Sequence, residues 1–233
     1  MIKKGFTLAE VLITLGIIGV IASLTLPALN ANVQKQQMGP ALAKAVNTLE
    51  NAGRMVLQDN NATKLSNVPD CKNGTNIKLF KGNSACLLKY INGAPLTAKE
   101  DYYSFDNKTE EYNPGSAVDS VDGDMAIVTK DGIAYYQADL QIDDDNPYIK
   151  LYLDLNGPSK KPNALGKDLF IVGITNKGVV IPIGGRADAA INDFSEPDWA
   201  GDGCNGSKVT RPDACAGAIA DNGWQVKYEW YTK

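Results

Sequence analysis

Histidine is the residue that this 233-residue chain lacks altogether. Its absence removes the commonest general base of enzymes and the commonest neutral ligand of metal ions. The sequence also contains no glycine-rich phosphate loop and no pattern typical of a nucleophilic triad. Acidic residues are plentiful, so a pair of carboxylates is the one open route to acid–base catalysis, but no spacing places two of them in one cleft. We therefore expect that the chain is not an enzyme.

Clustered positive charge is missing as well. The chain has 23 lysines and arginines against 27 acidic residues, for a formal net charge of −4. Because nucleic-acid binding depends on basic side chains gathered on one surface, we expect no dedicated nucleic-acid site. The length allows one domain of about 200 residues in addition to a short terminal segment.

Cysteine is scarce, with four residues at Cys71, Cys86, Cys204 and Cys215. A zinc site is disfavoured because no Cys-x-x-Cys pair and no histidine is present. An even number of cysteines in an exported chain favours disulfides, and three pairings are possible. The local pairing, Cys71 with Cys86 and Cys204 with Cys215, closes loops of about fifteen and eleven residues. In the chain-entropy description each of these disulfides stabilises the fold by roughly 3 kcal/mol.

Charge is absent from residues 11–29, a run of nineteen residues that is long enough to cross a bilayer. A helix that begins at Phe6 and continues to Leu29 would be about 36 Å long. Lys3 and Lys4 precede it, and the positive-inside rule places this end in the cytoplasm and the chain after Leu29 on the exported side. The sequence thus predicts one membrane-spanning helix over residues 6–29.

Glu10 is the one carboxylate at the start of this apolar helix. A charged group inside a spanning segment is costly, and proteins retain it where a partner compensates. A glutamate in the first helical turn also favours the helix dipole, but this does not account for Gly5 and the lysines directly upstream. Cleavage after Gly5 would expose a new α-amine on Phe6. Glu10 of one chain would then neutralise the amine of a neighbouring chain within a bundle of apolar helices.

Residues 5–13, Gly-Phe-Thr-Leu-Ala-Glu-Val-Leu-Ile, resemble the class III signal of type IV prepilins and type II secretion pseudopilins. The resemblance implies that a prepilin peptidase cuts between Gly5 and Phe6 and then N-methylates Phe6. It also implies an assembly role for Phe6 and Glu10.

The resemblance extends over about residues 3–30. Gly19 and Pro27 fall where family members carry a helix glycine and a helix-kinking proline, whereas Ala9 replaces a bulkier aliphatic residue. Beyond residue 30 only the general layout is similar.

The resemblance implies a structural subunit of a type IV pilus or a type II secretion pseudopilus. Such a subunit is held among the lipids of the bacterial inner membrane as a single-pass protein with a cytoplasmic N-terminus. Inner-membrane assembly machinery then incorporates it, with homologous pilin or pseudopilin subunits, into a periplasmic or extracellular filament. The alternative is an unpolymerised, membrane-anchored binding domain that keeps residues 1–5 and is displayed in the periplasm or on the cell surface.

The predicted organisation is a leader at 1–5, a spanning and filament-core helix at 6–29, its amphipathic continuation at 30–60, and an exported β-rich domain at 61–233. The continuation carries an apolar stripe at helical spacing, formed by Leu42, Val46, Leu49, Gly53 and Val56. We expect Pro27 and Gly39-Pro40 to kink or locally unwind the helix, and residues 59–61 to end it.

Strand patterns become clear after residue 125. Two hairpins are predicted, with turns at 130–132 and 176–178, because each turn ends in a glycine between apolar runs. Residues 149–155 alternate between apolar and polar side chains, which predicts a half-buried strand. The expected fold is α+β: the long helix covers an antiparallel sheet of four or five strands, an arrangement that the family resemblance also implies.

The end of the chain carries two further patterns. Residues 213–221 predict a short helix closed by Asn222-Gly223. From Trp224 onward aromatic and aliphatic residues alternate with polar ones through Trp230, which predicts a strand or extended arm. Its aromatic face is expected to pack on the core, and the alternative is an exposed ridge that binds a partner.

Asp154, Asn156 and Asp168 form the one candidate metal site, and no other cofactor is expected. Asp154-Leu155-Asn156-Gly157 resembles the opening of a calcium loop, to which Asp168 can return. The acidic ligand expected at the end of such a loop is absent, because Leu165 stands there. The alternative is a turn in which these side chains accept hydrogen bonds from their own backbone.

Overall fold

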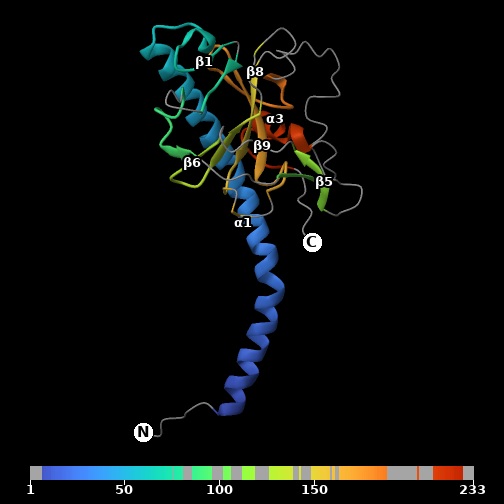
Figure 1. Cartoon of the computed structure of the whole chain (residues 1–233). Coiled ribbons are helices and arrows are strands. Elements are labelled where there is room, and N and C mark those ends of the chain that lie inside the picture. Colours follow the sequence, from blue (N-terminus) through green and yellow to red (C-terminus); the bar gives the residue numbers. More distant parts are fainter. Residues whose placement is uncertain are drawn as a thin grey trace.

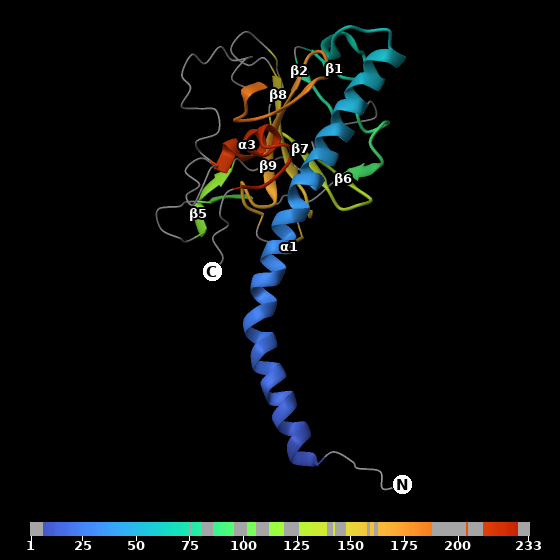
Figure 2. The same cartoon turned by 180° about the vertical axis from the view of Figure 1, so that it is seen from behind.

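The computed structural model describes residues 7–74, 76–80, 86–95, 102–105, 112–118, 126–138, 142, 148–157, 159–160, 163–187, 204 and 212–227. A single long helix, α1 (Leu8–Asp59), organises the molecule. Its N-terminal half projects away from a β-rich body, and its C-terminal half lies against that body (Figures 1 and 2). The two predicted helical segments are therefore one continuous element.

Helix α1 begins after Thr7 and ends at Asp59. Asn60 caps its C-terminus, and Asn61 takes a positive φ of 47°, a conformation that asparagine tolerates better than most residues. The helix passes through Pro27 and Gly39-Pro40 without interruption, so the predicted local unwinding is wrong. The helix is continuous and curved (Figure 1).

The predicted apolar stripe on α1 is buried. Leu42 and Leu49 are fully buried, and Val46 and Val56 are 4% and 1% exposed. Gly53 has a specific role here, because a Cβ atom at this position would lie 2.9 Å from the carbonyl oxygen of Gly178. The missing side chain lets the helix and the turn at residues 176–178 meet backbone to backbone.

The main sheet has six antiparallel strands in the order β10-β9-β8-β7-β6-β3. The prediction of an antiparallel sheet under the helix is confirmed, and one strand at the sheet edge was missed. The missed strand consists of Gly-Ala-Pro, which carries no periodic pattern. The six strands are β3 (Gly93–Pro95), β6 (Ala126–Thr129), β7 (Ala134–Gln137), β8 (Tyr148–Asp154), β9 (Leu169–Thr175) and β10 (Val180–Pro182).

Both predicted hairpins are present. Strand β6 pairs with β7, with Ile127 opposite Tyr135, and β9 pairs with β10, with Gly173 opposite Ile181. Gly132 and Gly178 have φ values of 89° and 75°, a region that only glycine occupies without strain.

Smaller elements surround the sheet. Two two-stranded ribbons and three short helical pieces are described in addition to α1 and the main sheet. They are η1 (Leu65–Asn67), β1 (Lys72–Asn73), β2 (Asn76–Ile77), β4 (Tyr102–Phe105), β5 (Tyr112–Val118), η5 (Pro212–Ala214) and α3 (Cys215–Asp221).

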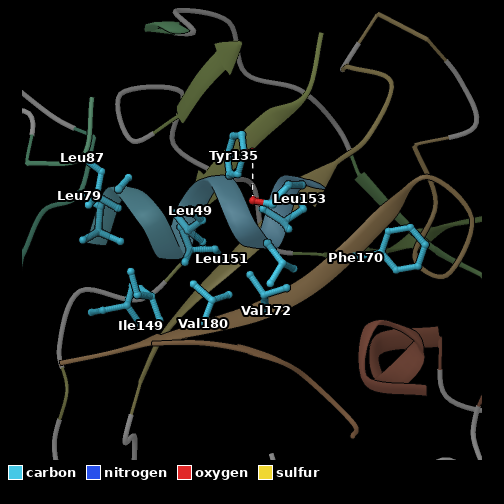
Figure 3. Close-up of a cluster of buried hydrophobic side chains, with 14 of the residues drawn as sticks. Leu49, Leu79, Leu87, Tyr135, Ile149, Leu151, Leu153, Phe170, Val172 and Val180 are labelled. Atoms are coloured by element: carbon cyan, nitrogen blue, oxygen red, sulfur yellow. Dashed lines mark hydrogen bonds between the residues drawn. The ribbon is translucent and has the colours of Figure 1, made fainter. Parts of the chain in front are cut away.

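The principal core lies between α1 and one face of the sheet. Figure 3 shows Leu49 on α1 among side chains of β8 and β9, including Leu151 and Val172. Tyr135 on β7 belongs to the same cluster, and its hydroxyl donates to the carbonyl oxygen of Ala45 at 3.2 Å. Burial raises the pKa of this tyrosine, so the hydroxyl stays protonated and keeps donating to the helix backbone.

The opposite face of the sheet is covered too. Tyr136, Tyr152 and Ile171 form a second buried cluster there. The prediction that residues 149–155 form a half-buried strand is therefore wrong for its second half, in which Tyr152 and Asp154 are also buried. Alternation of residue types detects one apolar face, and it does not reveal that a tyrosine ring on the other face is covered.

Two disulfides close loops of the chain, and all four cysteines are buried in the principal core cluster. Cys71 bonds to Cys86 and Cys204 bonds to Cys215, which is the local pairing among the three possibilities. Gln137 on β7 ties the first of these loops to the sheet. Its side chain accepts a hydrogen bond from the backbone N–H of Leu79 at 2.8 Å and donates to the carbonyl oxygen of Ile77 at 2.5 Å.

The C-terminal segment follows α3, which ends as predicted at Asn222 and Gly223. Trp224 and Val226 are partly buried against the core, in agreement with the core interpretation, although residues 224–227 form no strand. Tyr228 and Trp230 lie outside the described residues.

Candidate assembly site at the start of the helix

Thr7 and Glu10 form a reciprocal cap at the N-terminus of α1. The threonine hydroxyl oxygen accepts a hydrogen bond from the backbone N–H of Glu10 at 3.3 Å. In return, one carboxylate oxygen of Glu10 accepts from the backbone N–H and from the hydroxyl of Thr7, both at 2.9 Å. This is a capping box, which satisfies backbone donors that have no partner within the helix.

The capping box holds the Glu10 carboxylate toward the N-terminal end of the chain. The carboxylate accepts from the backbone N–H of the residue directly after Phe6, and the helix dipole favours a negative charge at this position. Gly5 and Phe6 themselves lie outside the described residues.

Sequence reasoning did not identify Thr7 as part of this site. Its signature is nevertheless readable, because Thr-Leu-Ala-Glu is the Thr-x-x-Glu spacing of a capping box ahead of an apolar run. The interpretation of Glu10 as a residue that favours its own helix start therefore holds in the single chain. This role leaves the carboxylate exposed and accessible to a further partner.

Helix α1 offers an apolar surface directly after the cap. Residues Leu8–Leu26 satisfy the length and composition of a membrane span, and none of this segment is buried in the single chain. Thr14 and Ser23 donate their hydroxyl hydrogens to carbonyl oxygens of their own helix, at 2.9 Å to Glu10 and 2.8 Å to Val20. These bonds remove two polar groups that would be costly in lipid. The segment is compatible with anchoring in a membrane.

The candidate calcium residues are brought together, as the sequence suggested. The Asn156 side-chain amide donates to a carboxylate oxygen of Asp168 at 3.2 Å. Asp154 accepts from the backbone N–H groups of Asn156 and Gly157, at 3.2 and 2.9 Å. These backbone hydrogen bonds are those of a turn, which is the alternative to a calcium loop.

Asp168 is nearly buried, at 5% exposure, and both of its oxygens accept hydrogen bonds. The backbone N–H of Ala164 donates at 2.7 Å to one oxygen, and the N–H of Asn163 donates at 2.9 Å to the other. Burial raises the pKa of this carboxyl group, and the two backbone donors act against that rise. The carboxylate acts as the acceptor that closes the loop between β8 and β9.

We expect this loop to be stable without calcium. Excess EDTA and millimolar calcium should give the same thermal unfolding midpoint for the full chain in detergent. Asp168→Asn should lower the unfolding free energy by roughly 1–3 kcal/mol in either condition, because the two backbone donors bond different carboxylate oxygens and the asparagine NH2 group cannot accept from either of them. A calcium-dependent rise of the midpoint that disappears in Asp168→Asn would contradict this prediction.

No cluster of three or more acidic or cysteine side chains that would suit a metal ion is found within the described ranges. The further acidic groups at residues 119–124 and 143–145 lie outside those ranges.

Comparison with known proteins gives one match. Residues 1–26 match the family model of the prokaryotic N-terminal methylation motif. No curated protein and no solved structure matches the chain.

The N-terminal motif is the finding that indicates a class of protein. The chain carries the class III signal of type IV pilins and pseudopilins, ahead of a long apolar helix and an antiparallel sheet with two disulfides. The motif supports a precursor that is similar to type IV pilins and pseudopilins. The motif implies processing by prepilin peptidase and pilin-like assembly.

Proposed function

We propose that this protein is a structural subunit of a type IV pilus or type II secretion pseudopilus. It is processed after Gly5 and assembled into a helical filament through its N-terminal helix. One observation carries this proposal: a preorganised carboxylate at Glu10, placed next to the cleavage point and followed by an apolar surface that the single chain leaves uncovered.

The precursor is held in the inner membrane by α1. Lys3 and Lys4 keep the N-terminus in the cytoplasm, which places the disulfide-bearing domain on the oxidising side of the membrane. The leader peptide is then removed by the prepilin peptidase and Phe6 is methylated. Assembly machinery in the inner membrane moves the mature subunit into the filament.

Charge pairing between chains sets the register of the filament. In an apolar bundle the attraction between the Glu10 carboxylate and the Phe6 amine of a neighbour is enlarged by the low dielectric. Either charge alone would be unfavourable there, so only the register that pairs them is acceptable. Head-to-tail contacts between two different surfaces of a subunit produce an open filament.

Close approach of the helices is favoured by small residues on α1. A Cβ atom added at Gly16 or Gly19 would meet nothing within 4 Å in the single chain, so both positions leave room for a neighbouring backbone. Small residues of this kind allow transmembrane helices to pack closely. Thr14, Ala22 and Ser23 belong to the same set.

The second candidate function is a membrane-anchored binding domain that never polymerises. The observation in its favour is that the exported body packs around the helix within a single chain and needs no neighbour for its core. Such a protein would retain residues 1–5, with Glu10 acting only as the helix cap.

Mass spectrometry of the protein purified from its native membrane separates the two functions. We expect the mature chain to begin at Phe6 and to carry one additional methyl group, because cleavage creates the amine that Glu10 pairs with. A Gly5→Glu variant is the control, since a bulky charged residue before the cut should leave the chain at its precursor mass. A wild-type chain that still contains Met1–Gly5 would support the anchored binding domain instead.

A further inference from the structure

A cavity of about 510 Å³ lies between α1 and the segment that follows α3. It is lined by Lys35, Gln36, Pro40, Trp224, Gln225 and Val226. The α1 residues of this cavity lie where the helix leaves the β-rich body, since Met38 and Gly39 are the first buried residues along the helix (Figures 1 and 2). The cavity thus lies on the side of the body that faces the apolar half of α1.

The contact that forms this cavity depends on Gly39. A Cβ atom at this position would lie 1.9 Å from the carbonyl oxygen of Trp224, so only glycine lets the C-terminal segment lie directly on the helix. Trp224 itself has a φ of 62°, which is unusual for a bulky side chain. Its backbone N–H donates to the carbonyl oxygen of Ile219 at 2.8 Å, which holds this conformation. The fold therefore holds the backbone of Trp224 in a strained conformation at the membrane-facing end of the body.

The distance along α1 places the near edge of the cavity just beyond the layer of lipid headgroups, within reach of the Lys35 side chain. The uncharged run ends at Leu29, and Lys35 follows six residues later, about 9 Å further along the helix axis. The headgroup layer on each side of a bilayer is about 5–8 Å thick. Helical side chains point back toward the N-terminus, so the side chain of Lys35 extends toward the membrane. Val33, which is 41% exposed, continues the apolar surface almost to the cavity.

The charge of the lining favours an anion. Lys35 is its one ionisable side chain, and the exposed Lys227 comes directly after Val226. Among the described residues neither lysine has an ion-pair partner. Lysine attracts anionic lipid, and tryptophan is enriched at membrane–water interfaces.

We propose that this cavity binds the headgroup of an anionic phospholipid in the exported leaflet, with the Trp224 indole at the interface. The contact seats the globular body on the membrane surface while the subunit awaits assembly. It is lost when the subunit enters a filament. The inference rests on the membrane-anchored state of the proposed function and does not require cleavage or polymerisation.

The test uses the full uncleaved chain in lipid nanodiscs, with Trp199→Phe and Trp230→Phe so that Trp224 is the sole tryptophan. Its fluorescence is measured against lipids that carry a spin label on the headgroup. We expect stronger quenching in bilayers containing phosphatidylglycerol than in phosphatidylcholine alone. Lys35→Glu should abolish or reverse this preference, lowering the ratio of lipid-bound to lipid-free cavity at least roughly fivefold, the effect expected for the loss of one positive charge. The matched control is Lys177→Glu, an exposed lysine of the turn between β9 and β10, which should change nothing.

Resistance to alkaline extraction confirms that α1 is inserted in every variant, so a failure of anchoring is distinguished from a failure of this inference. Equal quenching of Trp224 in the two bilayers, or quenching that Lys35→Glu leaves unchanged, would overturn the inference. Either result would leave the cavity to a neighbouring subunit or a soluble ligand.

Discussion

Glu10→Ala is expected to reduce the yield of filaments by at least about tenfold while the chain is still inserted in the membrane. The physical reason is that the Phe6 amine of each neighbour would lie in an apolar bundle without a counter-charge. Filaments sheared from cells are quantified against total subunit, and alkaline extraction measures insertion. The comparison is made at equal expression, because assembly depends on subunit concentration.

Two further variants separate the charge of Glu10 from its role as a helix cap. Glu10→Gln retains an oxygen that can accept from the N–H of Thr7, as glutamine does in capping boxes, but it removes the charge. Thr7→Ala removes the hydroxyl and keeps the charge. We expect Glu10→Gln to assemble as poorly as Glu10→Ala, and Thr7→Ala to assemble nearly normally. Normal filaments from Glu10→Gln would show that the site serves the helix cap and not charge pairing.

Loss of the Cys71–Cys86 disulfide is expected to lower the unfolding free energy of the exported body by about 3 kcal/mol. The bond closes a loop of 15 residues in sequence, and both cysteines are almost fully buried beside the core. The Cys71→Ala/Cys86→Ala double variant should show this loss in urea unfolding of the full chain in detergent. Alanine is chosen because serine would bury an additional hydroxyl group.

The second disulfide provides the matched comparison. Cys204→Ala/Cys215→Ala opens a loop of 11 residues and should cost nearly as much, because the loop-closure entropy changes only slowly with length. A reducing agent opens both disulfides, so it should lower the unfolding free energy of the wild type by more than either double substitution does. It should leave the unfolding free energy of a variant without all four cysteines unchanged. Unfolding curves of the wild type that do not respond to reduction would contradict this account.

The long helix and most of the sheet are predictable because their signals are local. The stripe from Leu42 to Val56 repeats at helical spacing, and the two hairpins carry glycine at positions that need a positive φ. Strand β3 has no such pattern. Its three residues pair with β6, which is more than thirty residues further along the chain, and such a pairing leaves no local signal in the sequence.

Contacts between distant backbones could not be predicted from the sequence. The sequence suggests that Gly39 belongs to a helix-breaking pair with Pro40. In the fold its missing side chain lets the carbonyl group of Trp224 approach the helix. Gly53 fits an apolar stripe, and its role is to contact Gly178. A glycine destabilises a helix locally, and the sequence reveals this. The backbone contact that compensates for it joins the glycine to a residue more than a hundred positions away in the chain.

In the candidate assembly site and in the loop after β8, too, the sequence identifies some residues and does not reveal the contacts of others. Periodicity and charge identify Glu10 as unusual, and the Thr-x-x-Glu spacing would have identified Thr7. The turn at Asp154 and Asn156 could be proposed from sequence, but the two backbone donors to Asp168 depend on how the following loop folds back.

The pairing of Glu10 with the amine of an adjacent chain can be observed directly by solid-state NMR on filaments. Subunits labelled with ¹⁵N-phenylalanine are mixed before assembly with subunits labelled with ¹³C-glutamate, so that a contact between the labels must join two chains. The account predicts a dipolar contact between the methylated Phe6 amine and a glutamate carboxyl carbon in these mixed filaments. A contact that appears only when both labels are in the same chain, or no contact at all, would contradict it.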